Sequence, residues 1–359
     1  KNVDIITMDK NNTIIKDGYV VIKEDTIDYV GKEISSLHEK YKNYTIIDGG
    51  KGILMPGMVN CHTHVSMVPF RSLADDEKDR LKKYIFPLES KLVDRELVYH
   101  GAKYGICEML LSGVTTFCDI YYYEDEVAKA CDELNIRAVL GETVVDFCSP
   151  DSKLPYGGLE YGEYFIKKWN KNGLITPAIA PHAPYTNDDK HLKSAFNLSK
   201  KYNVPMIMHL AEMDFEYEKY KKEYNLTPVQ YLNKLGVLDK NFIAAHLVLV
   251  NEKDLEILKE CSVGVSHNMG ANAKGAKGVA PIIEMKKRGI DIGLGTDGPM
   301  SGNTLDIITQ MSLVGKIHKL YNKDRTILPA KDIVYMATMG GAKALNLDKI
   351  IGSVEVGKK

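Results

Sequence analysis

Two histidines one residue apart, His62 and His64, end an apolar run that starts at a Pro-Gly turn in the sequence MPGMVNCHTHVSM (55–67). Residues i and i+2 of a β-strand point to the same face, so the two imidazoles are expected to lie side by side. Such a pair suits a shared metal ion, although two polar residues can also cap a strand at the surface. The motif alone does not decide, because short motifs often match by chance.

The same placement of polar residues recurs along the chain. Of ten histidines, six stand at or just after the end of an apolar, strand-like run: His62, His64, His182, His209, His246 and His267. Asp297 follows an eighth such run, and Glu212 comes three residues after His209. The other four, which fall in helical or connecting segments and are expected to be solvated, are His38, His100, His191 and His318. Unpaired imidazoles in a protein rim cost desolvation energy, so the joint pattern favours a metal site.

Eight apolar runs are predicted to be the strands that position these side chains: 53–61, 114–120, 136–145, 175–181, 204–209, 241–247, 262–267 and 291–296. Each is followed by a stretch with helical periodicity, for example EVAKACDEL or NEKDLEILKEC. Eight strands that alternate with helices indicate an α/β chain folded as a (β/α)₈ barrel. In such a barrel the catalytic residues lie at the carboxyl ends of the strands, where the histidines are expected.

The two chain ends lack the alternation of strands and helices that is predicted for the barrel. Residues 1–50 hold three β-branched runs, VDIITM, GYVVIKEDTIDYVG and YTIIDGG, and the last nine residues, IGSVEVGKK, read as a further turn and strand. A sheet with exposed edges needs partner strands. We therefore expect 1–54 and 346–359 to form a small β-sandwich domain, with its C-terminal part incomplete, beside a barrel of residues 55–345.

Composition excludes several classes of protein. The 359 residues are 44% hydrophobic and 26% charged, with a net charge of −1, which argues against nucleic acid or an anionic membrane as the main partner. No apolar run approaches the ~20 residues of a membrane span, and the first residues do not resemble a signal peptide. The six cysteines form no CxxC pair and are expected to be free and buried. These features indicate a cytoplasmic protein with a small-molecule partner, and leave a homo-oligomer open.

The type and number of metal ions can also be predicted from the candidate ligands. A set of three imidazoles and one carboxylate, without a thiolate, suits Zn²⁺ best, with Fe²⁺ and Mn²⁺ as alternatives. A pair of ions would need a bridging anion, such as a modified lysine or a glutamate, on a middle strand. The fourth strand ends in IAPHAPY and offers His182 instead, so we expect one ion.

With these residues placed, the chain resembles the amidohydrolase superfamily and, within it, the family of chlorohydrolases and aminohydrolases. The stretches that carry the resemblance run in order along the chain: MPGMVNCHTH (55–64), FPLESKL (86–92), SGVTTFCDIYYY (112–123), APHAPYT (180–186), MHLAEM (208–213), AAHLVL (244–249), VSHNMGANAKGAKGVAP (265–281) and GLGTDGPMSGNTLDI (293–307). The framework of this family carries divergent substrates, so the resemblance specifies the fold more closely than the substrate.

The resemblance implies a role for each matching residue. The metal ligands are His62, His64, His209 and Asp297. His246 is implied to hydrogen-bond the metal-bound water, Glu212 to carry a proton to the ring, His182 to touch the heterocycle and Glu89 to accept hydrogen bonds from ribose hydroxyls. For His267 and Asn268, structural and supporting roles stay equally open.

The implied reaction is metal-dependent hydrolytic deamination of an adenosine-type nucleoside to its inosine analogue and ammonia. Candidate substrates are 5′-methylthioadenosine, 5′-deoxyadenosine, adenosine and S-adenosylhomocysteine. The alternative is hydrolysis of another heterocycle, such as guanine, cytosine, a pterin or a triazine. Glu89 separates the two, because a free base has no ribose diol, although a carboxylate after Pro87 also suits a helix start. A scaffold protein on an inactive barrel would have lost a ligand or the acid, and none is lost here.

One position departs from the family pattern. Family members that accept S-adenosylhomocysteine carry an arginine near the end of the third strand, where this chain reads RAVLGETVVDF and offers Glu142. Lys153 in the following loop is the nearest cation in the sequence. The departure predicts that Glu142 faces the 5′ end of the substrate and disfavours a carboxylate there. Neutral adenosines should then be preferred to S-adenosylhomocysteine.

Overall fold

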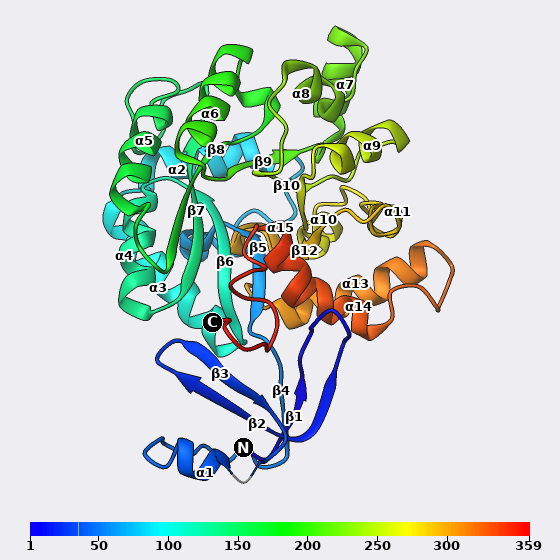
Figure 1. The fold of residues 1–359 in the computed structure, drawn as a ribbon. Coiled ribbons are helices and arrows are strands. Elements are labelled where there is room, and N and C mark those ends of the chain that lie inside the picture. The colour runs from blue at the N-terminus through cyan, green and yellow to red at the C-terminus, as the bar shows by residue number, and fades with distance from the viewer. Residues whose placement is uncertain (35) are drawn as a thin grey trace.

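The computed structural model describes residues 1–34 and 36–359, and the side chain of His38 lies outside what is described. Figure 1 shows a large barrel wrapped by helices and a small sheet beneath it. The barrel holds the middle of the chain, and both chain ends meet at the small sheet. The predicted fold class, an α/β barrel with a small β unit built from the two ends, is confirmed.

The barrel consists of eight parallel strands that neighbour one another in chain order: β5 (Met58–Thr63), β6 (Val114–Tyr121), β7 (Arg137–Val144), β8 (Ile175–Pro181), β9 (Met206–Leu210), β10 (Phe242–His246), β11 (Gly264–His267) and β12 (Ile292–Leu294). Each overlaps one predicted strand. The barrel closes where the amides of Thr296 and Asp297 donate to the His62 carbonyl at 3.1 and 3.0 Å. The eighth strand thereby brings Asp297 next to the first.

The first predicted strand, 53–61, is in fact divided between two sheets. Its beginning forms β4 (Gly52–Leu54), which pairs with β1 (Val3–Ile6) of the small sheet, and the barrel strand starts at Met58. Pro56 has no backbone N–H to give to a ladder, so the strand cannot run through it. The Pro-Gly turn therefore marks the passage from the small sheet into the barrel.

Most helices cover the outside of the barrel and connect its strands, while the short helix at Ser36–Lys40 lies beside the small sheet (Figure 1). The α-helices are α1 (Ser36–Lys40), α2 (Phe86–Leu92), α3 (Arg95–Leu111), α4 (Glu124–Leu134), α5 (Gly158–Trp169), α6 (Asp189–Tyr202), α7 (Asp214–Tyr224), α8 (Pro228–Leu235), α9 (Glu252–Glu260), α10 (Met269–Lys274), α11 (Ile282–Lys287), α12 (Pro299–Gly302), α13 (Ile307–Tyr321), α14 (Ala330–Tyr335) and α15 (Gly341–Ala344). Short 3₁₀ or π turns are η1 (Val65–Phe70), η2 (Leu81–Ile85), η3 (Pro184–Thr186) and η4 (Met336–Gly340).

Alternation along the strands divides the core into two layers. Val139 of β7 and Ile207 of β9 point into the barrel, where they pack with residues of α15. Ala138 and Leu140, the neighbours of Val139, belong to the larger cluster that includes the helices. Residues i and i+2 of a strand share a face. A polar residue at the end of a strand therefore points to the same face as the apolar residue two positions before it.

The small sheet has the order β3 (Thr26–Gly31), β2 (Ile14–Lys23), β1 and β4. The predicted β run at 44–50 is not a strand: Ile46 and Ile47 are 64% and 78% exposed. Lys1 exchanges backbone hydrogen bonds with Ile47 O and Gly49 N of this run, but in the described residues these bonds do not extend into a strand ladder.

The C-terminal tail lies against this sheet. Val354 N donates to Thr7 O at 2.8 Å, Ile27 N donates to Lys358 O at 2.7 Å, and the Val354 side chain packs with Val3 and Ile27. We propose that 1–54 and 346–359 form one small domain around this contact.

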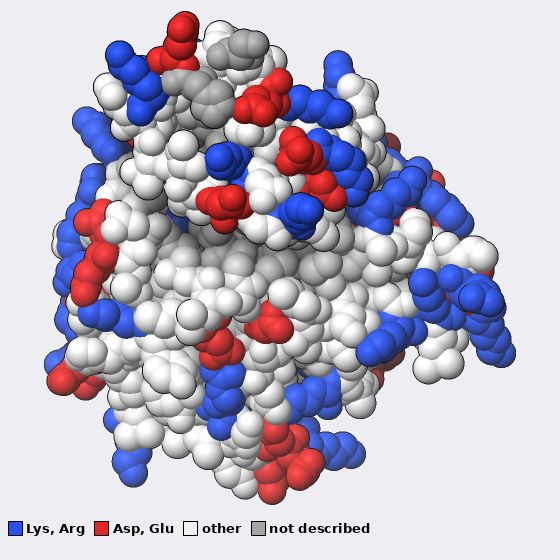
Figure 2. Space-filling model, turned by 90° about the horizontal axis from the view of Figure 1, so that it is seen from below, with Lys and Arg blue, Asp and Glu red and all other residues white. Residues whose placement is uncertain are grey.

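Seen from below, the molecule carries basic and acidic side chains close together, with uncharged surface between them (Figure 2).

Two further expectations can be compared with the structure. In the described residues, no helix combines the length and apolar character that a membrane crossing requires. All six cysteines are free, as expected. Cys107 and Cys148 are exposed and Cys261 is half-buried, so the expectation that all six are buried is wrong for these three.

Candidate metal and active site

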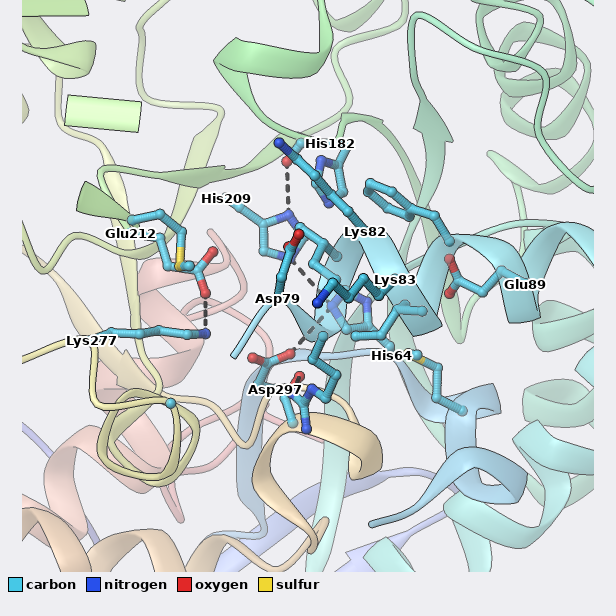
Figure 3. Close-up of a pocket in the computed structure, with 18 of the residues that line it drawn as sticks. His64, Asp79, Lys82, Lys83, Glu89, His182, His209, Glu212, Lys277 and Asp297 are labelled. Atoms are coloured by element: carbon cyan, nitrogen blue, oxygen red, sulfur yellow. Dashed lines mark hydrogen bonds and ion pairs between the residues drawn. The ribbon is translucent and has the colours of Figure 1, made fainter. Parts of the chain in front are cut away.

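Three histidines and one aspartate converge at the carboxyl end of the barrel, and Figure 3 shows three of these four residues, His64, His209 and Asp297. His62 lies on β5, His64 follows that strand, and His209 lies on β9. The Nε2 atoms of His62 and His64 lie 3.8 and 3.3 Å from Asp297 Oδ1, and His209 Nε2 lies 3.3 Å from His64 Nε2. One ring nitrogen from each histidine falls within 4.8 Å of the others. These atoms could all reach a single ion.

Hydrogen bonds orient two of these rings. His64 Nδ1 lies 2.6 Å from the Ile120 carbonyl, and His209 Nδ1 lies 2.7 Å from the His182 carbonyl. A carbonyl oxygen can only accept, so Nδ1 carries the hydrogen in both rings. The lone pair is then on Nε2, which faces the other ligands. Metal-binding histidines are commonly oriented in this way by their second nitrogen.

The ring of the third histidine, His62, lacks hydrogen-bond partners in the described part of the chain. It is fully buried, and neither ring nitrogen has a hydrogen-bond partner among the described residues. Burial, followed by the neighbouring histidines, holds the pKa of His62 well below its usual value, and burial does the same for His209. Buried neutral imidazoles with unused lone pairs beside a carboxylate are what a divalent cation requires. The site fits such an ion.

Two residues of the site have unusual backbone conformations. Asp297 has a φ of +60° and His246, the last residue of β10, a φ of +79°. Residues other than glycine pay about 1–3 kcal/mol for such conformations, and these cluster at functional sites. For Asp297, the hydrogen bond from its amide to His62 O holds the conformation and aims the carboxylate at the histidines.

A second group adjoins the first. His246 Nε2 lies 3.5 Å from Glu212 Oε1 and 3.9 Å from Asp297 Oδ2, and has no hydrogen-bond partner among the described residues. Its Nδ1 lies 2.8 Å from Asn272 Oδ1, which fixes the ring. Lys277 forms an ion pair with Glu212. Burial opposes the charge on Glu212, but His246 and Lys277 outweigh it and lower its pKa to about 2.

These groups open into a cavity of about 530 Å³. His182, just after β8, and Glu89, on α2, both line it, and Figure 3 shows Glu89 on the side away from Glu212. Burial lowers the pKa of His182 to about 4, and it raises the pKa of Glu89 to about 7. The cavity thus brings the candidate metal site, the Glu212 carboxylate, His182 and Glu89 together.

Glu142 does not join this group. On β7, Val139, Gly141 and Thr143 share the face that points into the barrel, and Glu142 belongs to the opposite face. Of residues 141–144 at the end of β7, only Thr143 lines the cavity. The Glu142 side chain points outward instead, where Oε2 accepts a hydrogen bond from the Glu124 amide at 3.0 Å. Lys153 is exposed and does not line the cavity either. The structure therefore gives no support to the expectation that Glu142 faces the 5′ end of the substrate and disfavours a carboxylate there.

The remaining histidines divide into buried and surface residues. His267, at the end of β11, is buried, and its Nε2 lies 2.9 Å from Nε2 of His318 on α13. The expectation that His318 is solvated is wrong, because α13 packs this ring against the barrel. His191 stacks on Tyr156 and lies 2.6 Å from Asp188, so it belongs to the helix layer. His100 is exposed, as expected.

Sequence reasoning missed several residues of the cavity, above all Lys277. Its partner Glu212 lies 65 residues earlier in the chain, and a lysine in a glycine-rich segment reads as a surface residue. Lys82 and Lys83 of η2 also line the cavity. Only the folded chain brings these cations to the site.

The sequence also matches a protein-family model. The model described as the amidohydrolase family matches residues 53–359. The chain belongs to the amidohydrolase family. The predicted family is confirmed, and the chain is a hydrolase of the type that acts on C–N bonds.

Curated relatives extend the likeness over the whole chain. A protein of Thermoanaerobacter pseudethanolicus named 5-methylthioadenosine/S-adenosylhomocysteine deaminase is 40% identical over 363 residues, covering 100% of this chain and 83% of the relative. A relative from Syntrophus aciditrophicus, with the same name and the number 1, is 38% identical over 357 residues, covering 99% of this chain and 80% of its own length.

Solved structures resemble the whole chain as well. An adenosine deaminase from Xanthomonas campestris with bound zinc superposes with a TM-score of 0.92 at 28% identity, covering 99% of this chain and 82% of that one. An atrazine chlorohydrolase from Arthrobacter aurescens, at 21% identity and a TM-score of 0.90, covers 99% of this chain and 85% of its own and shares the fold.

Proposed function

We propose that this member of the amidohydrolase family removes the amino group from an adenosine-type nucleoside, releasing ammonia and the inosine analogue. One observation carries the proposal: in a single cavity, Glu212 faces the metal-binding histidines from one side and the buried Glu89 lies on the other. The names of the curated relatives support the same substrate class.

The site is proposed to hold one Zn²⁺ through His62, His64, His209 and Asp297. The zinc in the related adenosine deaminase supports this choice of metal. A bound divalent cation lowers the pKa of a water molecule, so that it can act as a nucleophile near neutral pH. His246 is proposed to accept or donate a hydrogen bond at that water through Nε2, the atom that has no protein partner in the described residues.

The protein's own carboxylates are proposed to move the protons. Addition of water to the ring carbon that bears the amino group places negative charge on the adjacent ring nitrogen. Glu212, ionised in the resting site, takes a proton from the attacking water at a carboxylate oxygen and delivers it to that nitrogen. Asp297 takes the second proton and passes it to the amino group, which leaves as ammonia.

Substrate recognition is assigned to His182 and Glu89. His182 lies 5.9 Å, between ring centroids, from Phe86, so the two rings can border a planar heterocycle. Glu89 is 5% exposed and turned to the cavity, where its carboxylate can accept hydrogen bonds from a ribose diol. A free base offers no such diol, and this favours a nucleoside over guanine, cytosine, a pterin or a triazine.

A comparison of substrate classes tests the proposal. Ammonia release by purified protein is measured for 5′-methylthioadenosine, adenosine, adenine, guanine, cytosine, a pterin and a triazine. We expect the nucleosides to have the highest kcat/KM, and Glu89→Gln to lower kcat/KM for them while sparing adenine. A preference for any free base or triazine would instead support the alternative heterocycle.

The metal stoichiometry gives a second expected result. Purified active protein should contain one divalent ion per chain, because His182 stands where a bridging anion would be needed for a second ion. Chelation should abolish turnover, and one equivalent of Zn²⁺ should restore it. Elemental analysis with an activity assay checks both, and two tightly held ions in active protein would contradict the single-ion site.

The far end of the substrate is expected to meet basic residues. Lys82 and Lys83 line the cavity and have no carboxylate partner in the part of the chain that is described. The Lys82→Ala/Lys83→Ala protein should lose about two- to thirtyfold in kcat/KM for S-adenosylhomocysteine, since exposed ion pairs contribute ~0.2–1 kcal/mol each. The values for 5′-methylthioadenosine should hardly change.

Glu142→Gln serves as the matched variant for this prediction. Its carboxylate points away from the cavity, so the substitution should shift kcat/KM for the two substrates in equal proportion. A selective change for S-adenosylhomocysteine in Glu142→Gln, but none in the double lysine variant, would return the role of reading the 5′ end to Glu142.

A further inference from the structure

Lys277 is an unusual residue for its surroundings. It lies in the segment between α10 and α11, yet its side chain is only 14% exposed and lines the cavity beside the metal site. Figure 3 shows its ammonium directed at Glu212, with which it forms an ion pair. A lysine this far from water needs a partner for its charge, and the Glu212 carboxylate, 11% exposed, supplies it.

The loop that carries Lys277 is built to direct it inward. The Lys277 amide donates to the carbonyl of Asn272 at 2.9 Å, and Gly278 follows with a φ of +118°, a conformation open to glycine. The side chain of the same Asn272 holds His246 Nδ1. One turn after β11 thus fixes two groups of the site, His246 through Asn272 and Glu212 through Lys277.

Glu212 is held from two directions. Its backbone is fixed by Glu216, whose Oε2 accepts from the Glu212 amide at 3.0 Å and whose Oε1 accepts from the Ala211 amide at 3.0 Å. These bonds leave the Glu212 side chain free to rotate. Lys277 restrains that rotation and keeps Oε1 at 3.5 Å from His246 Nε2, on the side that faces Asp297.

We propose that Lys277 is a positioning residue: its ammonium holds the Glu212 carboxylate in place, aimed at the reacting ring. The inference rests on the proposed function, in which Glu212 moves a proton. Lys277 keeps its own protons throughout. It only orients Glu212, the group that carries a proton, so the proton balance of the reaction does not change. Displacement of such a group lowers kcat far more than it changes the affinity for the substrate.

Kinetics of two variants give the first test. Lys277→Met removes the charge and keeps the length, so kcat should fall about 10- to 100-fold. KM for 5′-methylthioadenosine should change little and metal content should not change. Lys277→Arg keeps the charge and should recover most of kcat. Lys287→Met is the matched control, because that exposed lysine pairs with Glu284 on the surface of α11. Wild-type kcat in Lys277→Met, or equal loss in the Arg and Met proteins, would overturn the proposal.

A structural readout tests the inference without any turnover. In a crystal structure of metal-loaded Lys277→Met, the Glu212 carboxylate should leave its place beside His246 Nε2, while Glu216 still holds the Glu212 backbone. A carboxylate that stays in place would overturn the role of Lys277, whatever the substrate. If Lys277→Met does not fold, Lys277→Gln serves the same comparison. Absence of nucleoside turnover in the wild type would count against the proposed function alone.

Discussion

Replacing Glu212 by glutamine should leave the metal site filled and lower kcat by about two to four orders of magnitude, the usual contribution of a general acid–base group. The glutamine amide keeps the shape of the side chain but can no longer take a proton from water and pass it to the ring. None of the four proposed metal ligands changes. Steady-state kinetics and metal analysis of the same preparation measure both effects.

Glu218→Gln provides the control for this substitution. It removes an exposed carboxylate from α7, the helix that follows Glu212, and should behave as the wild type. Near wild-type turnover by Glu212→Gln would show that another group carries the proton. Loss of metal in Glu212→Gln would instead place Glu212 among the ligands.

Asp297→Asn should have two effects, a loss of turnover as large as that of Glu212→Gln and a weaker metal site. Asp297 is the only carboxylate placed against both His62 and His64 in the described structure, at 3.8 and 3.3 Å. A neutral amide oxygen is a poorer ligand for a divalent cation, and we expect metal affinity to fall by at least about tenfold.

Competition with a chromophoric chelator measures this affinity. Glu212→Gln removes a negative charge from the same cavity without removing a proposed ligand, so it should bind the metal nearly as the wild type does. If both substitutions weaken the metal equally, the effect comes from charge in the cavity, and Asp297 has no special place in the ligand set.

Strand ends were the informative part of the sequence. Apolar runs of the right length predicted all eight barrel strands, because a parallel strand buried on both faces needs continuous apolar residues. His62, His64 and His209 were found because polar residues at the ends of such runs meet on one rim. The local sequence pattern was enough to predict these three residues, because the direction of each side chain follows from the strand that carries it.

The errors arose where distant contacts decide. The run at 44–50 has β-branched residues but finds no partner strand, and Pro56 divides the first predicted barrel strand. Glu142 was expected at the cavity because it was matched to the position of an arginine in the family pattern. A shift of one residue reverses the face of a strand side chain, and the sequence did not fix that register. His318 and Lys277 are buried by helices and loops that only the folded chain brings together.

The central claim is deamination of a nucleoside, and product analysis tests it most directly. Zinc-loaded protein is incubated with 5′-methylthioadenosine, and ammonia and the purine product are quantified together over time. We expect ammonia and 5′-methylthioinosine to appear in equal amounts, and neither to appear with Glu212→Gln on the same timescale. Recovery of unchanged nucleoside from the metal-loaded wild type, alongside turnover of a free base or triazine, would contradict it.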